Sequence, residues 1–347
     1  MPKPWIVPVG GFLGAGKTTL ILAAAKLLSA RGLRPAAILN DQAGDLVDTA
    51  LARSAGISAD EVTGGCFCCR FSDLISAAER LEQFAPDVIF IEPVGSCTDL
   101  AATILRPLLR DFTERYRVAP LTVLVDPGQA RRMEQADSKV RFLFEHQLQE
   151  ADIVAFSKCE THATFPELPR VNAMRLSASE GTGLDAWLNE VLSGEVVPGT
   201  KLIEVDYREY AAAEAALGWL NWSGSVSFET PMTAAALLGP LVEELETALR
   251  NAGGTIAHLK VLSEAPGSYL KLAVTDNDEG LIVEGDLAAS PAQCIRVRIN
   301  LRAVVDAKLI EHIFWQSLRH SSGTWTTERF QCFSPAAPVP ERRIAGI

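Results

Sequence analysis

The chain has 347 residues, of which 48% are apolar and 22% are charged, a balance that is ordinary for a globular protein of one or two domains. Its net charge of −11 argues against a broad nucleic-acid-binding surface, because contacts to phosphate backbones need clustered lysine and arginine. No apolar run approaches the roughly 18 residues of a membrane-spanning helix. The first residues lack the apolar core of a secretory signal, so we expect a cytoplasmic protein.

Between residues 5 and 160, short apolar and β-branched runs alternate with longer stretches of helical character. Such alternation predicts a parallel sheet flanked by helices. The predicted strands are apolar almost throughout, as expected where both faces of a sheet are buried. Strands are expected at residues 5–10, 36–41, 87–93, 121–127 and 152–158, helices at 17–31, 72–84, 97–116 and 128–149, and a short closing unit at 174–192.

The composition changes near residues 193–200, where SGEVVPGT has the glycine, proline and serine content of a linker. Beyond it, the pattern predicts a smaller α+β domain in which two helices cover a sheet. Its strands are expected at residues 223–229, 255–262, 269–276 and 294–301, and its helices at 234–254 and 304–318. We therefore expect two domains, residues 1–195 and residues 196–347.

The sequence GFLGAGKTT at residues 11–19 matches G-x-x-x-x-G-K-[ST] and stands between the first predicted strand and the first predicted helix. In this context the glycines let backbone amides turn toward phosphate groups, and the helix start adds a favourable dipole. Lys17 would reach the β- and γ-phosphates, and Thr18 would hold Mg²⁺. The fold expected here is that of a P-loop NTPase. The residues expected to bind nucleotide in this loop are Gly11, Gly14, Ala15, Gly16, Lys17, Thr18 and Thr19.

Acidic residues follow two other predicted strands, at the sheet edge where ligands bind in open α/β folds. Glu92 in IFIEPVG would lie near Mg²⁺ or the attacking water, and Gly95 would let the backbone approach the γ-phosphate. Asp41 ends the second strand, and Asp48 follows seven residues later. Each of these two is either a carboxylate on the Mg²⁺ side or a helix cap. The candidate catalytic residues are Lys17, Glu92 and Asp41.

A partial base-recognition signal, SKCE at residues 157–160, follows the fifth predicted strand, where GTPases read guanine with Asn-Lys-x-Asp. Lys158 can pack its stem over the base. Glu160 can accept the guanine N1–H and N2–H, although its additional methylene shifts the carboxylate. The later segment LSASEGTG would present a backbone amide at Ser177 and Ala178 to the guanine O6. These features favour guanine over adenine.

The sequence GGCFCCR at residues 64–70 places three of the chain's seven cysteines in four positions. Without an export signal, the odd cysteine total and the tight clustering favour thiols and metal over disulfides. Three thiolates suit Zn²⁺ or Cu(I), and Co²⁺ less selectively. One metal bound to all three needs a bent backbone, which the glycine pair could supply. The candidate metal ligands are Cys66, Cys68 and Cys69.

The cluster lies between Asp48 and Glu92, an interval that holds nucleotide-responsive switch segments in phosphate-loop hydrolases. Its fourth ligand must come from Asp41, Asp45, water or a partner protein. An incomplete ligand set suits metal transfer, because a closed four-ligand site releases metal slowly. A plain thiol cluster and a redox pair are the alternatives. Cys97 could join the site, but a small buried residue is the favoured interpretation there.

Together these residues resemble the CobW-type family of phosphate-loop GTPases, which includes metallochaperones and nitrile hydratase activators. The resemblance covers roughly residues 5–190 and rests on GGFLGAGKTTL, the Asn40-Asp41…Asp48 segment, GGCFCC as Cys-x-Cys-Cys, and Glu92-x-x-Gly95. It implies GTP hydrolysis coupled to delivery of a metal, commonly zinc or cobalt, to a client. The second half would correspond to the family's smaller C-terminal domain, thought to help meet the client.

Two departures from the family pattern bear on function. SKCE replaces Asn-Lys-x-Asp, which affects nucleotide specificity, and the family's frequent histidine-rich tract is missing, which argues against metal storage. We expect a metal-responsive GTPase that uses GTP, Mg²⁺ and Zn²⁺ or Co²⁺ and meets a client metalloprotein; a homodimer is left open. The alternative is a zinc-sensing nucleotide-binding module or scaffold with little turnover. A small-molecule kinase ranks last because it leaves the cysteines unexplained.

Overall fold

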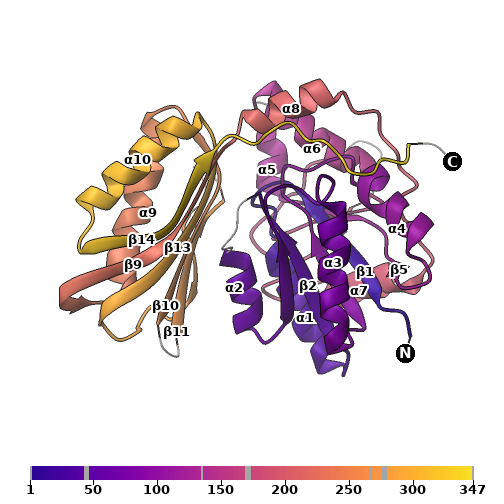
Figure 1. Cartoon of the computed structure of the whole chain (residues 1–347), viewed down its shortest axis with the longest axis horizontal. Coiled ribbons are helices and arrows are strands. Elements are labelled where there is room, and N and C mark those ends of the chain that lie inside the picture. Colours follow the sequence, from indigo (N-terminus) through magenta and orange to yellow (C-terminus); the bar gives the residue numbers. More distant parts are fainter. Residues whose placement is uncertain are drawn as a thin grey trace. The chain divides into compact units, whose positions relative to one another are not determined.

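The computed structural model describes residues 2–42, 47–133, 136–168, 173–265, 268–275 and 280–345. The chain divides into two compact units (Figure 1). The first unit contains Met1–Gly44, Asp48–Ala213 and Ala337–Ile347, and the second contains Asp45–Val47 and Glu214–Ala336. In the described part of the chain, no helix has the length and apolar character that crossing a membrane requires.

The first unit is built on a parallel sheet with strand order β3-β2-β4-β1-β6-β7-β8, and β5 pairs with the first residues of β1. The central strands β1, β2 and β4 are buried over nearly their whole length, which explains their uninterrupted apolar sequences. The predicted α/β fold is therefore confirmed. The strands are β1 (Trp5–Gly11), β2 (Pro35–Asn40), β3 (Ser58–Val62), β4 (Val88–Glu92), β5 (Arg117–Val118), β6 (Thr122–Val125), β7 (Ile153–Phe156) and β8 (Met174–Arg175).

Helices flank this sheet, and two of the predicted ones are divided (Figure 1). The helix predicted at 97–116 is a π-helical segment, Ala101–Leu105, followed by a short α-helix that has Pro107 in its first turn. The helix predicted at 128–149 is two helices, because the Asp137 carboxylate accepts from the Lys139 amide and starts a new one. The helices are α1 (Lys17–Ala30), α2 (Val47–Ser54), α3 (Phe71–Leu81), α4 (Arg106–Asp111), α5 (Pro127–Met133), α6 (Ser138–Glu150), α7 (Leu184–Ser193) and α8 (Tyr207–Ala215), with a 3₁₀ turn at Glu82–Phe84.

The second unit is an antiparallel sheet with strand order β12-β11-β10-β13-β9-β14, covered by α9 (Ala234–Asn251) and α10 (Ala307–His320) (Figure 1). Leucine, isoleucine and valine side chains from both helices and the sheet form one buried core. The predicted smaller α+β unit is confirmed. Its strands are β9 (Gly218–Met232), β10 (Thr255–Ala265), β11 (Ser268–Val274), β12 (Ile282–Gly285), β13 (Ala292–Val304) and β14 (Thr324–Phe333).

Two segments expected in the second domain belong to the first unit. The sequence placed the boundary between residues 195 and 196, whereas the units change after Ala213 and the chain returns to the first unit at Ala337. Helix α8 is held there because the Tyr207 hydroxyl donates to Asp99, at 2.6 Å. The linker composition at 193–200 marks the end of α7 and not the end of the compact unit.

Candidate functional site

The loop between β1 and α1 is shaped by glycines in left-handed conformations. Gly11 has φ of +128°, and a β-carbon there would lie 2.5 Å from the Leu124 carbonyl oxygen on neighbouring β6. Gly16 has φ of +89° and directly precedes α1. Glycine adopts such conformations at little cost. The local sequence therefore gives the curved backbone from which a phosphate-binding loop directs its amides.

Lys17 is the first residue of α1 and is almost fully buried, with 7% exposure. Its ammonium donates to the carbonyl oxygens of Gly11 at 2.9 Å and Phe12 at 3.1 Å. A buried cation is stable only with such partners. These bonds fold the side chain back onto the backbone of the glycine loop.

Thr18 and Glu92 meet at the carboxyl edge of the sheet. The Thr18 hydroxyl donates to the two Glu92 carboxylate oxygens at 2.9 and 3.0 Å, and both side chains are buried. A hydroxyl and a carboxylate are hard oxygen donors, the class of ligand that Mg²⁺ prefers. The pair therefore fits a magnesium ion that completes its coordination with water and phosphate oxygens.

Gly95 brings the segment after β4 against the glycine loop. A β-carbon at Gly95 would lie 3.0 Å from Lys17 Nζ and 3.0 Å from the Leu13 amide nitrogen. Any larger residue would push the segment away from the lysine. The close approach is therefore a property of glycine at this position, and it places the Glu92–Gly95 turn beside the cation that would contact phosphate.

Asp41 and Asp48 lie on either side of residues 43–46, which include Asp45 and fall outside the described residues. Asp41 follows β2, and its amide donates to the Val62 carbonyl at 3.2 Å. Asp48 lies in the first turn of α2, a position that also suits a helix-start carboxylate. Both are half-buried, and their Mg²⁺-side role remains a prediction.

The Cys-x-Cys-Cys segment is a tight turn held by a side chain from the sheet. The Cys69 amide donates to the Cys66 carbonyl at 2.9 Å, and Gly64, with φ of +79°, leads into the turn. Asn40, the last residue of β2, donates to the Gly65 carbonyl at 2.8 Å and accepts from the Phe67 amide at 2.7 Å. The bent backbone that one metal would require is present.

The three sulfur atoms converge on one point. Sγ–Sγ distances are 3.3 Å for Cys66–Cys69, 3.6 Å for Cys68–Cys69 and 2.6 Å for Cys66–Cys68. Tetrahedral zinc with Zn–S bonds of about 2.3 Å separates its sulfurs by roughly 3.8 Å, so Cys66 and Cys68 would move apart on binding. In the described residues this is the only group of three or more Cys, His, Asp or Glu side chains whose ligand atoms converge in this way. Asp41 is not part of it.

A fourth thiol, Cys97, adjoins the cluster from the segment after β4. Its side chain is 1% exposed and lies close enough to the Cys66 and Cys68 thiols to influence their pKa values. Hydrogen bonds from Cys68, Cys69 and Cys97 lower the pKa of the Cys66 thiol well below its usual value despite burial. The hydrogen bond between Cys66 and Cys69 raises the pKa of the Cys69 thiol to about 11. The hydrogen bonds among the thiols thus favour loss of a proton from the cluster.

The SKCE segment lies beside a second pair of polar groups. Lys158, with φ of +51°, places its ammonium 2.5 Å from the buried Asp126 carboxylate at the end of β6. Burial raises the pKa of Asp126, but the Lys158 charge and hydrogen bonds outweigh it and lower the pKa overall. Glu160 accepts from the Ser179 hydroxyl at 2.6 Å. The Ser177 amide donates to the Thr182 carbonyl at 3.0 Å, so the amide of Ala178 is the better candidate for reading a base.

Residues 5–179, half of the chain, match the family described as CobW/HypB/UreG, nucleotide-binding domain. The chain belongs to the CobW/HypB/UreG family. The resemblance inferred from the phosphate loop, Glu92-x-x-Gly95 and the cysteine motif is thereby confirmed. The matched region ends in the segment that follows β8 and contains Ser177 and Ala178.

Two relatives of this CobW/HypB/UreG chain carry functional names. Hydrogenase maturation factor HypB of Escherichia coli (strain K12) is 26% identical over 178 residues, which cover 51% of this chain and 58% of the relative. The zinc chaperone CobW of Sinorhizobium sp is 29% identical over 221 residues, which cover 54% of this chain and 59% of the relative. The chain thus spans less than two thirds of each relative. Among solved structures, Zn(II)-bound YjiA GTPase from E. coli has 16% identity and a TM-score of 0.39, over 91% of this chain and 99% of that one.

Three residues of this CobW/HypB/UreG chain have a larger part in the site than the sequence indicated. Asp126 directly follows the apolar strand β6, and an acidic residue where a strand ends was the criterion that selected Glu92 and Asp41, so a signal for it was present. Asn40 also ends a strand, but its hydrogen bonds to residues 25 and 27 positions later have no signature in spacing. Cys97 is separated from the cysteine turn by a strand and a helix, and only the fold brings it there.

Proposed function

We propose that this chain hydrolyses GTP and couples hydrolysis to delivery of zinc or cobalt from the cysteine cluster to a client metalloprotein. Family membership supports a P-loop GTPase activity, and the names of the relatives, a zinc chaperone and a hydrogenase maturation factor, support a role in metal supply. The converging thiols supply a soft ligand set for the ion.

The observation that carries the proposal is the path of the segment after β4. Glu92 hydrogen-bonds with Thr18, Gly95 lies against Lys17, and Cys97 adjoins the thiols of Cys66 and Cys68. Gln147 of α6 donates to the carbonyls of both Gly95 and Cys97, at 2.9 and 2.8 Å. The segment from Glu92 to Cys97 therefore adjoins both the proposed nucleotide site and the cysteine cluster. A displacement of this segment at the γ-phosphate would also displace the groups next to the sulfur atoms.

In the proposed reaction the chain supplies positioning and charge. Lys17 would contact the β- and γ-phosphates, and the backbone at Gly95 would approach the γ-phosphate. Glu92 and Thr18 would hold Mg²⁺, which neutralises charge on the phosphate oxygens. Glu92 would also orient the attacking water. Catalysis of phosphoryl transfer rests on such positioning and electrostatic stabilisation.

For base choice we propose that Glu160 accepts from guanine and that the Ala178 amide reads O6. Burial raises the pKa of Glu160, but the Ser179 hydrogen bond and further bonds outweigh it and lower the pKa, which keeps the carboxylate ionised as an acceptor. Lys158 extends its stem from the same loop and is fixed by Asp126. This arrangement supports guanine without the asparagine that GTPases use.

Replacing Glu160 by glutamine is expected to weaken GTP binding by about 5- to 150-fold and to leave ATP binding unchanged. The amide retains one acceptor and opposes one guanine N–H with its own, a mismatch that costs about 1–3 kcal/mol. Competition of GTP and ATP against a fluorescent nucleotide measures both affinities. Glu190→Gln, on the exposed side of α7, is the matched control. Equal affinities of the native protein for GTP and ATP would contradict the assignment.

Zinc affinity is expected to differ at least about fivefold between the complexes with a GTP analogue and with GDP, the lower end of typical coupling. Delivery after hydrolysis requires the GDP complex to hold the metal less tightly. Titration of Zn²⁺ against a chelating indicator measures both states. Linkage requires zinc to change the ratio of the affinities for the GTP analogue and for GDP by the same factor, which is an internal control. Identical zinc affinities in the two complexes would mean that the nucleotide site and the metal site are not coupled, which would contradict the delivery mechanism.

A further inference from the structure

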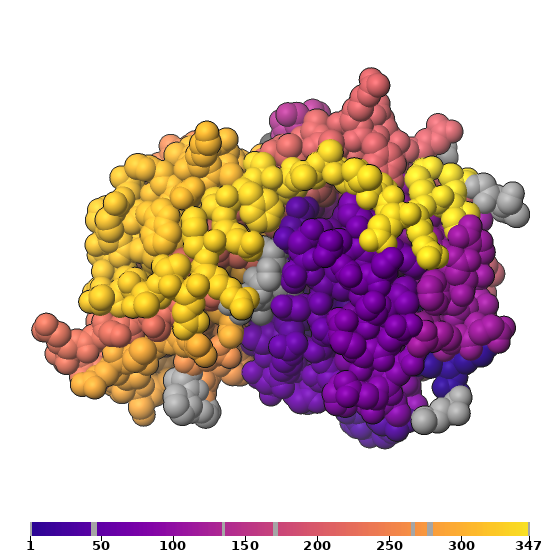
Figure 2. Space-filling view, viewed as in Figure 1, coloured from indigo at the N-terminus to yellow at the C-terminus, as the bar shows by residue number. Residues whose placement is uncertain are grey.

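The C-terminal tail, residues 337–345, lies on the first unit and crosses the cysteine turn. The Val339 amide donates to Cys69 Sγ at 3.2 Å, and the Glu341 amide donates to the Cys68 carbonyl at 2.9 Å. The space-filling view shows this tail, in yellow, spread over the surface of purple residues of the same unit (Figure 2). A segment more than 260 positions away along the chain thus contacts two of the three candidate metal ligands.

Further contacts fix the tail beyond the cysteine turn. The Glu341 carboxylate accepts from the amide and hydroxyl of Ser72, both at 2.8 Å, and so caps the first turn of α3. Arg342 pairs with Asp111 at 2.6 Å. The Ile344 amide donates to the Ala102 carbonyl at 2.9 Å. Polar contacts at successive residues give the tail one defined path.

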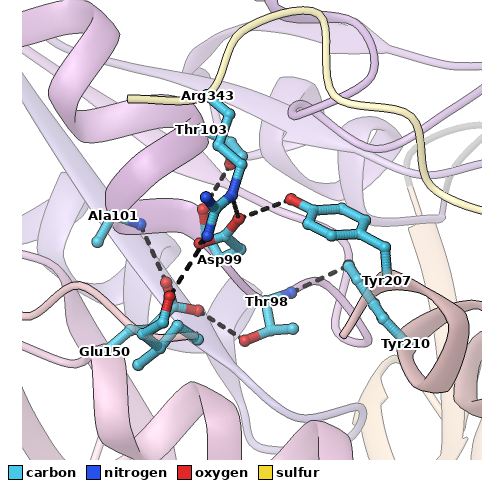
Figure 3. Close-up of polar contacts among 9 residues, drawn as sticks. Thr98, Asp99, Ala101, Thr103, Glu150, Tyr207, Tyr210 and Arg343 are labelled. Carbon is cyan, nitrogen blue, oxygen red and sulfur yellow. Dashed lines mark hydrogen bonds and ion pairs between the residues drawn. The ribbon is translucent and has the colours of Figure 1, made fainter. Parts of the chain in front are cut away.

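The more buried of the two arginine contacts joins Arg343 to Asp99. Arg343 Nε lies 2.6 Å from Asp99 Oδ2, and the Asp99 side chain is 1% exposed. The Tyr207 hydroxyl of α8 donates to the same oxygen at 2.6 Å, so Asp99 receives two charge-assisted hydrogen bonds (Figure 3). Asp99 has φ of +64°, a conformation that a non-glycine residue keeps only when its surroundings hold it. We call the Arg343–Asp99 pair the latch.

The backbone on either side of Asp99 is clamped from α6 and α8. The Glu150 carboxyl group accepts from the Thr98 hydroxyl at 3.1 Å and the Ala101 amide at 3.0 Å, and the Tyr210 hydroxyl accepts from the Thr98 amide at 3.1 Å (Figure 3). Burial raises the pKa of Glu150 to about 8. Glu150 therefore fixes the backbone on either side of Asp99, and the Asp99 carboxylate faces Arg343.

The latch belongs to the segment that already joins the two proposed sites. Asp99 is two residues beyond Cys97 and four beyond Gly95. If this segment moves with nucleotide state, Asp99 and the Cys97 thiol would be displaced together. The tail is thus bound to the segment that would respond to nucleotide, and it contacts the Cys69 sulfur, which a client would have to reach.

We propose that the C-terminal tail is a cover of the metal site, closed by the latch, and that a metal enters or leaves the thiols after the latch is released. This inference rests on the proposed binding of metal by Cys66, Cys68 and Cys69. The closed tail supplies a hydrogen bond to the Cys69 sulfur and occupies the approach to it. Its opening controls the rate of exchange more than the final affinity.

Arg343→Ala is expected to speed the withdrawal of Zn²⁺ by a chelating dye by about tenfold or more, the size that loss of one charge-assisted hydrogen bond implies. The number of zinc ions bound should stay the same. A second readout needs no metal: in the metal-free protein, alkylation of Cys69 by iodoacetamide, followed by mass spectrometry at one pH, should also become faster. Tyr207→Phe, which removes one donor to Asp99 and keeps the ring, should give a smaller change in the same direction.

Arg250→Ala is the matched control, because it removes an arginine paired with Glu246 in the second unit. A chain that ends at Ala336 tests the whole tail if the single variant is too mild. Unchanged zinc withdrawal and unchanged Cys69 alkylation in the folded variants would overturn the cover. Absence of zinc binding in the native protein would instead remove the proposed function, and the alkylation rates would still decide whether the tail covers the thiols.

Discussion

Replacing Lys17 by alanine is expected to lower the rate of GTP hydrolysis by about 10²–10³-fold. The lysine would be the charge that stabilises the transferring phosphoryl group, and loss of one such contact typically costs about 3–4 kcal/mol. Alanine is the best helix former, so α1 keeps its first turn. Release of inorganic phosphate under single-turnover conditions measures the chemical step.

Lys26→Ala is the control for this variant, because Lys26 lies on the same helix with its side chain exposed. Nucleotide affinity should be measured separately, since loss of the Lys17 charge weakens binding of the triphosphate as well. Full hydrolysis by Lys17→Ala, in a variant that unfolds like the native protein, would refute the assigned site. A loss of rate equal in both lysine variants would do the same, because it would show a general effect on α1.

The parts of the fold that the sequence predicted share one physical property. Strands such as β1, β4 and β6 are buried on both faces, so their apolar runs stand out from the surrounding chain. Edge strands lack this signal. β14, with the sequence TWTTERFQCF, lies at the edge of the second sheet and is largely exposed, and β12 at the other edge is four residues long. Neither has a pattern that periodicity can detect.

The candidate site divides in the same way. The glycine loop, Glu92 and the cysteine motif are local patterns, in which a few adjacent residues are enough to predict the chemistry. Asn40 and Cys97 act through contacts whose spacing along the chain is set by the strand order of the sheet. The tail is the extreme case. Its sequence, PVPERR, has the composition of a surface segment, and only the folded chain brings Arg343 to a buried carboxylate.

Replacing Cys66, Cys68 and Cys69 together by serine is expected to abolish tight binding of zinc. Loss of an outer-shell partner alone costs roughly 10–100-fold in metal affinity, and removal of the ligands themselves should exceed this. Serine preserves the size of each side chain and replaces a soft sulfur by a hard hydroxyl, which is a poor ligand for Zn²⁺ beside water. Competition with a chelating indicator measures affinity, and the thiolate charge-transfer absorption of bound Co²⁺ reports sulfur coordination directly.

Single variants then resolve the ligand set. At least two of the three serine substitutions should each weaken zinc binding, and Cys97→Ser tests whether the adjoining thiol is a fourth ligand or only packs against the others. Cys294→Ser, an exposed cysteine of β13, is the control. Affinity should rise with pH in the native protein, because thiols must lose protons to bind metal, and this dependence should vanish in the triple variant. If the triple variant binds zinc as tightly as the native protein, the cysteine turn is not the metal site.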